Sequence, residues 1–157
     1  MPDNVLKVEK LRKGVVIDHI PAGRGFTIAK YLGLFGERKD SLIIATNLVS
    51  RKYGKKDIIK IENKLLDDID LYTVGIFAPN ATISYINDFS VIKKVKPQLP
   101  QIITGIFSCQ NQACITKIEG RPKFYIENKN PVRLRCYYCE NIIDEETLVN
   151  IYYEDRD

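Results

Sequence analysis

Hydrophobic residues in the first hundred positions form short β-branched runs separated by a stretch with helical spacing. The run at 15–20 lies between a glycine and a proline and is typical of a mostly buried strand. Apolar residues recur at every third position from 25 to 35, which predicts a helix that stops at Gly36. The apolar run at 41–49 predicts a second strand.

The pattern continues with a strand, a helix and a hairpin. Residues 57–63 follow a basic turn and alternate apolar with polar side chains, as expected for a strand with one buried face. Asp67 can cap a short helix with an acidic first turn, which the helix macrodipole favours. Two more strands are predicted at 81–86 and 89–96, joined by a tight turn at Asn87-Asp88.

This order of elements contains the βαββαβ arrangement of a ferredoxin-like domain, an α+β fold whose helices cover one face of an antiparallel sheet. Two prolines between residues 96 and 100 mark a boundary, so we expect domains at 1–98 and 99–157. A domain as small as the second has a thin core and needs a further stabilising element. It is β-rich, with strands predicted at 102–107, 123–126, 132–134 and 148–153.

The composition is that of a globular protein. Of 157 residues, 45% are hydrophobic and 28% are charged, which excludes a disordered tail or a collagen-like fibre. No apolar run approaches the roughly 20 residues that span a bilayer, and the N-terminus lacks the pattern of a signal peptide. We therefore expect a cytoplasmic protein with no membrane partner. A single His excludes catalysis through several imidazoles.

The charge is unevenly distributed. Residues 1–100 hold 17 Lys and Arg against 11 Asp and Glu, a balance of +6, whereas residues 101–157 hold 7 against 9, a balance of −2. The net positive charge therefore belongs to the first domain, and the second domain is slightly acidic.

The four cysteines lie in the acidic part as two short-spaced pairs. Cys109 and Cys114 are separated by four residues and Cys136 and Cys139 by two, with 21 residues between the pairs. This spacing predicts a Zn²⁺ site of four thiolates, which is closed to substrate and therefore structural. A binding energy of about 10–16 kcal/mol is enough to fold so small a module.

Two disulfides, free core thiols and a redox pair at Cys136 and Cys139 are the alternatives. Disulfides are rare in the cytoplasm, and polar residues flank Cys136. Residues 140–143 make a poor candidate for the helix that follows a thioredoxin-like pair. We therefore favour structural zinc.

Lysines gather at two places in the first domain, 55–60 and 93–96. If the strands that carry them are neighbours, Lys60 and Lys94 share a pocket for a polyanion, with Lys56 nearby. The alternative is a solvated strand edge on which lysines prevent edge-to-edge aggregation.

Asp18 and His19 are polar residues at the end of a strand that otherwise looks buried. A hydrogen-bonded structural His is the commoner situation, although a carboxylate and an imidazole here could also contact a sugar hydroxyl and a phosphate. The sequence has no P-loop, no GxGxxG turn and no catalytic constellation.

These observations favour a binding or regulatory subunit. A zinc-ribbon protein that binds nucleic acid is the main alternative, and a small enzyme that uses the Cys cluster is another. Two observations argue against nucleic-acid binding. The net charge is modest, and the stretch 133–138, which combines basic and aromatic residues, belongs to the acidic part of the chain.

Three ungapped stretches and the cysteine spacing resemble the regulatory chain of aspartate carbamoyltransferase; the stretches are 14–22, 56–63 and 78–82. The resemblance implies a non-catalytic subunit with an N-terminal allosteric domain and a C-terminal zinc domain. In that family, regulatory chains form homodimers through their allosteric domains, and zinc domains dock on catalytic chains and so link catalytic trimers. CTP inhibits and ATP usually activates the first committed step of pyrimidine synthesis. The resemblance implies no nucleic-acid partner.

The resemblance also implies roles for individual residues. Asp18 would hold the ribose hydroxyls and Lys60 the ribose and base, while Lys94, helped by His19 and Lys56, would hold the triphosphate through charge-assisted hydrogen bonds. Ser84 and Phe89 stand where the family usually has Asn and Tyr. The remaining residues implied around the base are Val8, Leu11, Phe89 and Val91.

In the zinc domain, the resemblance places Asn111 and Glu140 against the catalytic chain. Ala113 and Asn141 replace polar or charged residues of the family there, so we expect some of these contacts to differ.

Overall fold

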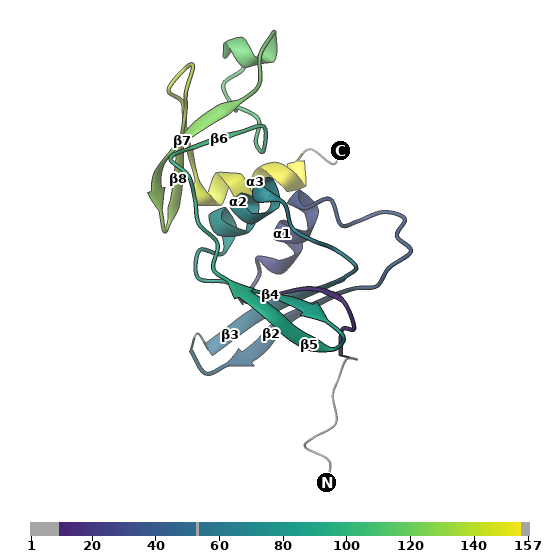
Figure 1. Cartoon of the computed structure of the whole chain (residues 1–157). Helices are drawn as coiled ribbons and strands as arrows, with labels where there is room; N and C mark the ends of the chain where they lie inside the picture. The colour runs from purple at the N-terminus through teal and green to yellow at the C-terminus, as the bar shows by residue number, and fades with distance from the viewer. Residues whose placement is uncertain (1–9, 53, 155–157) are drawn as a thin grey trace.

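The computed structural model describes residues 10–52 and 54–154, except the side chains of 152–154. A five-stranded antiparallel sheet with the order β2-β3-β1-β4-β5 forms the first half of the chain, and helices α1 and α2 lie on one face of it (Figure 1). The strands are β1 Gly14–Pro21, β2 Leu42–Ser50, β3 Gly54–Glu62, β4 Thr82–Asn87 and β5 Ser90–Val95, and the helices are α1 Gly25–Tyr31 and α2 Asp68–Phe77.

This arrangement confirms the ferredoxin-like βαββαβ prediction, with β5 added at the edge as the second strand of a hairpin. Alternation along the central strands decides which face the helices cover, because successive side chains point to opposite sides of the sheet. The helix-facing positions are fully buried; they include Val15, Ile17, Ile59, Ile61 and Ile83. The residues between them point to the face that no described helix covers (Figure 1).

Local signals set the ends of the helices. The predicted cap of α2 is present as a capping box, in which Asp67 accepts from the Asp70 amide at 2.7 Å and Asp70 accepts from the Asp67 amide. Helix α1 ends at Tyr31, so the predicted stop at Gly36 is wrong. The chain turns instead at Gly33, whose φ of 70° suits a glycine.

The β4–β5 hairpin turns one residue later than predicted. Asp88 and Phe89 both have positive φ, 50° and 64°, which is the geometry of the tight turn that matches the twist of a hairpin. A β-bulge at Ile92 then shifts the register, so that Tyr85 pairs with Lys93 and Ser84 with Lys94. The bulge therefore determines which lysine faces which side of the sheet.

The second half contains a four-stranded antiparallel sheet with the order β6-β7-β8-β9. Its elements are β6 Ile102–Thr104, the 3₁₀ turn Ile115–Lys117, β7 Lys123–Lys129, β8 Val132–Cys136, β9 Ile142–Asp144 and helix α3 Glu145–Glu154. Strand β6 ends before the predicted residue 107, and the sequence pattern did not reveal β9.

The predicted strand at 148–153 is wrong, because these residues belong to α3. Asp144 accepts a hydrogen bond from the Thr147 amide at 2.8 Å, which caps the helix, and two glutamates occupy its first turn. Leu148 and Ile151 are three residues apart and both buried, as an amphipathic helix requires.

The two halves share one hydrophobic core. Phe107 packs edge-on against the rings of Tyr31 and Phe77, at centroid distances of 5.1 and 6.0 Å. The Tyr31 hydroxyl donates to the Leu148 carbonyl at 3.1 Å, which joins α1 to α3. The boundary predicted at residue 98 therefore does not separate two independent hydrophobic cores. The division into two domains stays a prediction.

Within residues 10–52 and 54–154, no helix has both the length and the apolar character needed to cross a membrane.

Candidate functional site

The four cysteines converge as the spacing predicts. Their Sγ atoms all lie within 4.8 Å of one another, with Cys109 and Cys139 3.5 Å apart and Cys114 and Cys136 3.8 Å apart. Four sulfurs around one Zn²⁺ at about 2.3 Å are about 3.8 Å from each other, so the cluster has the size of a metal site. The same separations are too long for disulfides, whose sulfurs are about 2.05 Å apart.

Two short turns hold the thiols in place. In the first, Asn111 accepts from the Cys114 amide through its carbonyl and from the Ala113 amide through its side chain, both at 3.0 Å. In the second, Cys136 at the end of β8 accepts from the Glu140 amide at 3.0 Å and donates to the Asn141 carbonyl at 2.8 Å. The hairpin of β7 and β8 lies between the turns in sequence, where strands were predicted at 123–126 and 132–134.

The surroundings of the thiols shift their pKa values in opposite directions. Burial raises the pKa of Cys109 to about 12 and raises that of Cys136, whereas the Thr116 hydroxyl, 3.1 Å from Cys114 Sγ, lowers the pKa of Cys114 to about 7. Burial opposes ionisation of Cys139, but hydrogen bonding, first from the Asn111 side chain, lowers its pKa. A bound metal ion favours the thiolate form of all four. The donor set therefore fits a soft, tetrahedral, structural metal ion.

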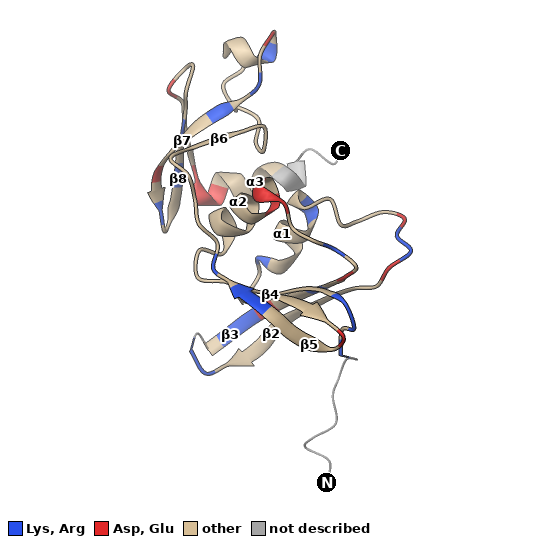
Figure 2. Cartoon of the chain, viewed as in Figure 1, with Lys and Arg blue, Asp and Glu red and all other residues tan. Residues whose placement is uncertain are grey.

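A second constellation lies on the open face of the first sheet. Lys60, Val16, Ser84 and Lys94 stand opposite one another in β3, β1, β4 and β5 and so form one row across the sheet. The strands of Lys60 and Lys94 are not neighbours, because β1 and β4 separate them, so the condition set for a shared pocket is not met. With about 4.8 Å between strands, the two Cα atoms lie about 14 Å apart. Figure 2 shows basic residues on β3, on β5 and in the β2–β3 hairpin.

Polar groups meet at the end of β1, next to this row. Lys56 Nζ lies 3.0 Å from one Asp18 carboxylate oxygen and 3.3 Å from the other. His19 has a φ of 59°, and its Nδ1 lies 3.2 Å from Thr82 Oγ1. Lys96 donates to the same hydroxyl at 2.8 Å. Thr82 was not predicted as part of this cluster; its place opposite Asp18 in β4 becomes visible only with the register.

The other predicted effector residues lie towards the opposite end of the sheet. Phe89 and Val91 belong to the β4–β5 hairpin and are half-exposed, and Leu11 is half-buried just before β1. Val8 lies outside the described residues. Asn111 and Glu140, predicted to face a partner chain, lie on the two turns that carry the cysteines, and both assignments remain predictions.

Asp57 is a fully buried residue that sequence reasoning missed. One carboxylate oxygen accepts from the amides of Gly23 and Gly25, at 3.0 and 2.9 Å, and the other from the Asn47 amide at 3.0 Å. A Cβ on Gly25 would lie 3.0 Å from the same oxygen, so the loop fits Asp57 only with glycine there. Asp57 could have been recognised from the sequence because it is an acidic residue at a position of the strand that faces the core.

The loop that Asp57 holds also contacts the second half. Arg24, which precedes α1, forms an ion pair with Glu145 in the first turn of α3. In β3, Lys56 forms an ion pair with Asp18, and the next residue, Asp57, binds the loop that follows β1. Because Arg24 of this loop pairs with Glu145, residues 21–25 connect the polar end of β1 to α3.

Comparisons with known protein families match both halves of the chain. Residues 6–98 match the family described as "Aspartate carbamoyltransferase regulatory chain, allosteric domain", and residues 101–149 match the metal binding domain of the same family. The regulatory chain from Pyrococcus furiosus is 42% identical over 147 residues, 92% of this chain and 96% of that one. The one from Methanocaldococcus jannaschii is 44% identical over 146 residues, 92% and 97% of the two chains.

Proposed function

Because the chain belongs to the family of aspartate carbamoyltransferase regulatory chains, we propose that it binds nucleoside triphosphate effectors on the open face of its first sheet and transmits their effect to a catalytic chain. The family is regulatory, so the chain is not itself a catalyst. The observation that supports effector binding best is the row Lys60–Val16–Ser84–Lys94, which presents two cations across a face that no described helix covers.

The proposed ligands are CTP and ATP. Lys94, His19 and Lys56 contact the triphosphate, because each can donate a hydrogen bond to phosphate oxygens and the lysines carry charge. Asp18 accepts from the ribose hydroxyls, and Lys60 contacts the ribose and base. Since Lys56 and Asp18 are paired before any ligand binds, a nucleotide that contacts both must rearrange this ion pair.

The metal is proposed to be one structural zinc ion held by Cys109, Cys114, Cys136 and Cys139. Zinc suits four thiolates in a tetrahedron and leaves no open position for substrate. When bound, it joins the two turns of the second domain. We place the protein in the cytoplasm, where thiols stay reduced and available to the metal.

The turns that carry the cysteines are the proposed docking surface for the catalytic chain. They lie at the end of the molecule away from the first sheet (Figure 1). Asn111 and Glu140 are on these turns, and Ile118 beside them is 85% exposed. A regulatory homodimer, formed through the first domain, would then link catalytic trimers.

Allosteric coupling of this kind is typically worth about 1–3 kcal/mol. A nucleotide can shift the assembly only if it binds one quaternary state more tightly than the other. The loop 21–25, held by Asp57 on one side and by Glu145 on the other, is a contiguous route from the polar end of β1 to the second domain.

Binding of CTP and ATP to the complex of regulatory and catalytic chains tests this function by calorimetry. We expect Lys60→Gln and Lys94→Gln to weaken both nucleotides at least tenfold, because each removes a charge-assisted hydrogen bond of about 1.5–3 kcal/mol. Lys39→Gln, in the exposed loop between α1 and β2, removes the same charge outside the row and serves as the control. Unchanged affinity in both test variants would refute the site.

A further inference from the structure

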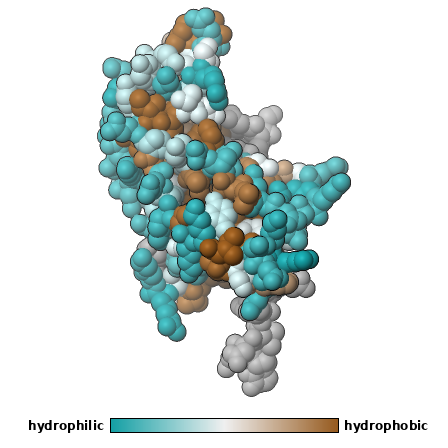
Figure 3. All heavy atoms as spheres, viewed as in Figure 1, coloured by the Kyte–Doolittle hydropathy of each residue, from teal (hydrophilic) through white to brown (hydrophobic). Residues whose placement is uncertain are grey.

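A pocket lies on the opposite side of the β4–β5 hairpin from the row of Lys60 and Lys94. It has a volume of about 670 Å³ and is formed by α2, by β4 and β5, and by the linker 96–100. This size is within the range of about 300–1,000 Å³ that is usual for small-molecule sites. Figure 3, viewed from this side, shows hydrophobic surface in the middle of the molecule with hydrophilic residues around it.

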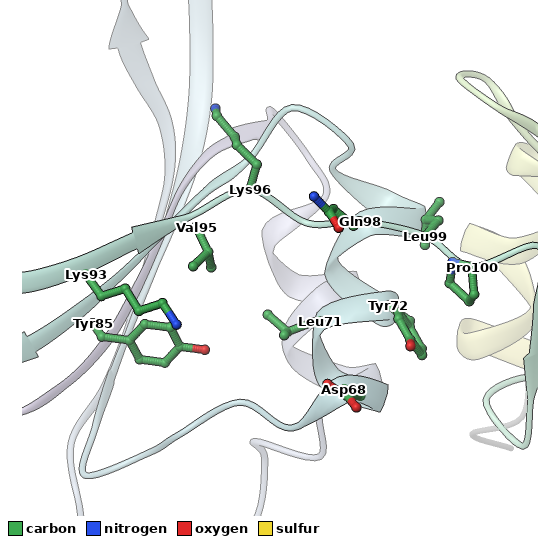
Figure 4. Close-up of a pocket in the computed structure, with 10 residues that line it drawn as sticks. All are labelled: Asp68, Leu71, Tyr72, Tyr85, Lys93, Val95, Lys96, Gln98, Leu99 and Pro100. Carbon is green, nitrogen blue, oxygen red and sulfur yellow. The ribbon is translucent and has the colours of Figure 1, made fainter.

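The pocket combines an apolar floor with a cationic edge. Leu71, Val95 and Leu99 line it and are only half-buried, so the fold leaves apolar surface open to solvent there. Lys93 and Tyr85 pair across β5 and β4, and Figure 4 shows both side chains extending from the strands towards α2. Leu71 extends from α2 towards them.

Three polar groups that line the pocket make no ion pair or hydrogen bond within the described part of the chain. The Lys93 ammonium group makes no ion pair or hydrogen bond with any described residue, and the hydroxyls of Tyr85 and Tyr72 make no hydrogen bond with one. Burial, and then the charge of Asp70, raises the pKa of Tyr85, which keeps its hydroxyl protonated and able to donate. A cation and a neutral donor are thus available side by side.

We propose that this pocket binds a small organic anion with a flat apolar body, an aryl carboxylate or an aryl phosphate, whose anionic group is held by Lys93 and Tyr85. The apolar body covers Leu71 and Val95, and removal of this apolar surface from water favours binding. Charge-assisted hydrogen bonds from Lys93 select the anion over a neutral analogue.

The site is separate from the proposed nucleotide site, although the two lie on one strand. Lys93 and Lys94 are consecutive, and because strand side chains alternate, Lys93 faces α2 while Lys94 faces the open side of the sheet. A ligand in the pocket contacts α2, the edge hairpin and the linker together. Gly75 shows how closely this linker packs on α2, since a Cβ there would lie 3.0 Å from Leu99.

Amide NMR titrations of the full-length, metal-loaded chain test the proposal with benzoate, phenyl phosphate, benzyl alcohol and inorganic phosphate as probes. We expect saturable shifts around Tyr85 and Leu71 with benzoate or phenyl phosphate, and binding about tenfold weaker or absent with the other two. The comparison of the two aryl anions identifies the preferred anionic group.

Lys93→Gln and Lys94→Gln form a matched pair of variants for the same titrations. Lys93→Gln is expected to weaken the aryl anion about tenfold and to leave nucleotide binding unchanged, and Lys94→Gln is expected to do the reverse. The proposal is overturned if no aryl anion saturates, if inorganic phosphate binds as well as benzoate, or if Lys93→Gln has no effect. Because nucleotides are titrated separately, these results do not depend on the proposed effector site.

Discussion

The two halves of the chain are stabilised by different means. In the first, Ile17, Ile59 and Ile83 are fully buried between a five-stranded sheet and two helices, so hydrophobic packing is its main source of stability. The second has short strands, and its four Cys side chains converge within 4.8 Å. The half proposed to bind the effector therefore has extensive packing between sheet and helices, whereas we expect the half proposed to bind the partner to depend on a metal ion.

Removing a thiolate should have the largest effect, and it should be confined to one half. Cys114→Ser is expected to abolish stable metal binding and with it about 10–16 kcal/mol of folding energy for the second domain. Metal content should fall below one ion per chain, and amide hydrogen exchange should lose protection in β7 and β8 while β1 and β3 stay protected. Uniform loss of protection across both sheets would show that the two halves are not stabilised independently.

Removing the buried carboxylate should destabilise the other half. Asp57→Ala leaves three backbone amides without their acceptor, and at about 1–3 kcal/mol for each unsatisfied group the loss is about 3 kcal/mol or more. Denaturant unfolding measures this loss. Metal content should stay at the wild-type level, and Asp57→Asn, which keeps one acceptor oxygen, should lose less. A variant as stable as the wild type would contradict the anchoring role.

Breaking the ion pair between the halves should have the smallest effect on stability. Arg24 and Glu145 are 22% and 29% exposed, so Glu145→Gln is expected to cost about 1 kcal/mol in unfolding experiments. In Glu145→Gln, the change in activity that CTP causes in the assembled enzyme should fall by a larger factor than the affinity for CTP. The exchanged pair Arg24→Glu with Glu145→Arg should restore part of the response, and a full response in Glu145→Gln would exclude this route.

Local patterns in the sequence were sufficient to predict the cysteine cluster and most of the first domain. The cysteine spacing requires only two turns and a hairpin, and the cap at Asp67 depends on its own next three residues. The row of Lys60 and Lys94 was harder, because both were singled out as cations but their separation by β1 and β4 is a matter of sheet order.

Tertiary packing accounts for what the sequence did not reveal. The segment 148–153 contains β-branched and aromatic residues, which favour a strand, yet it forms a helix whose residues Leu148 and Ile151 are buried at helical spacing. Asp57 appeared as one polar residue among many, because its three donors come from a turn and from a bulge in another strand. Thr82 likewise gains its importance only from its neighbours across the sheet.

The bulge at Ile92 has a consequence for how this surface can change during evolution. In a regular hairpin that kept every residue, Lys93 would stand opposite Ser84, and Lys94 would stand opposite the buried Ile83. Loss of Ile92 alone would instead remove the bulge and leave both lysines where they are. An in-frame deletion of one codon is thus tolerable at this position, whereas one at either lysine would remove a charge from one of the two surfaces.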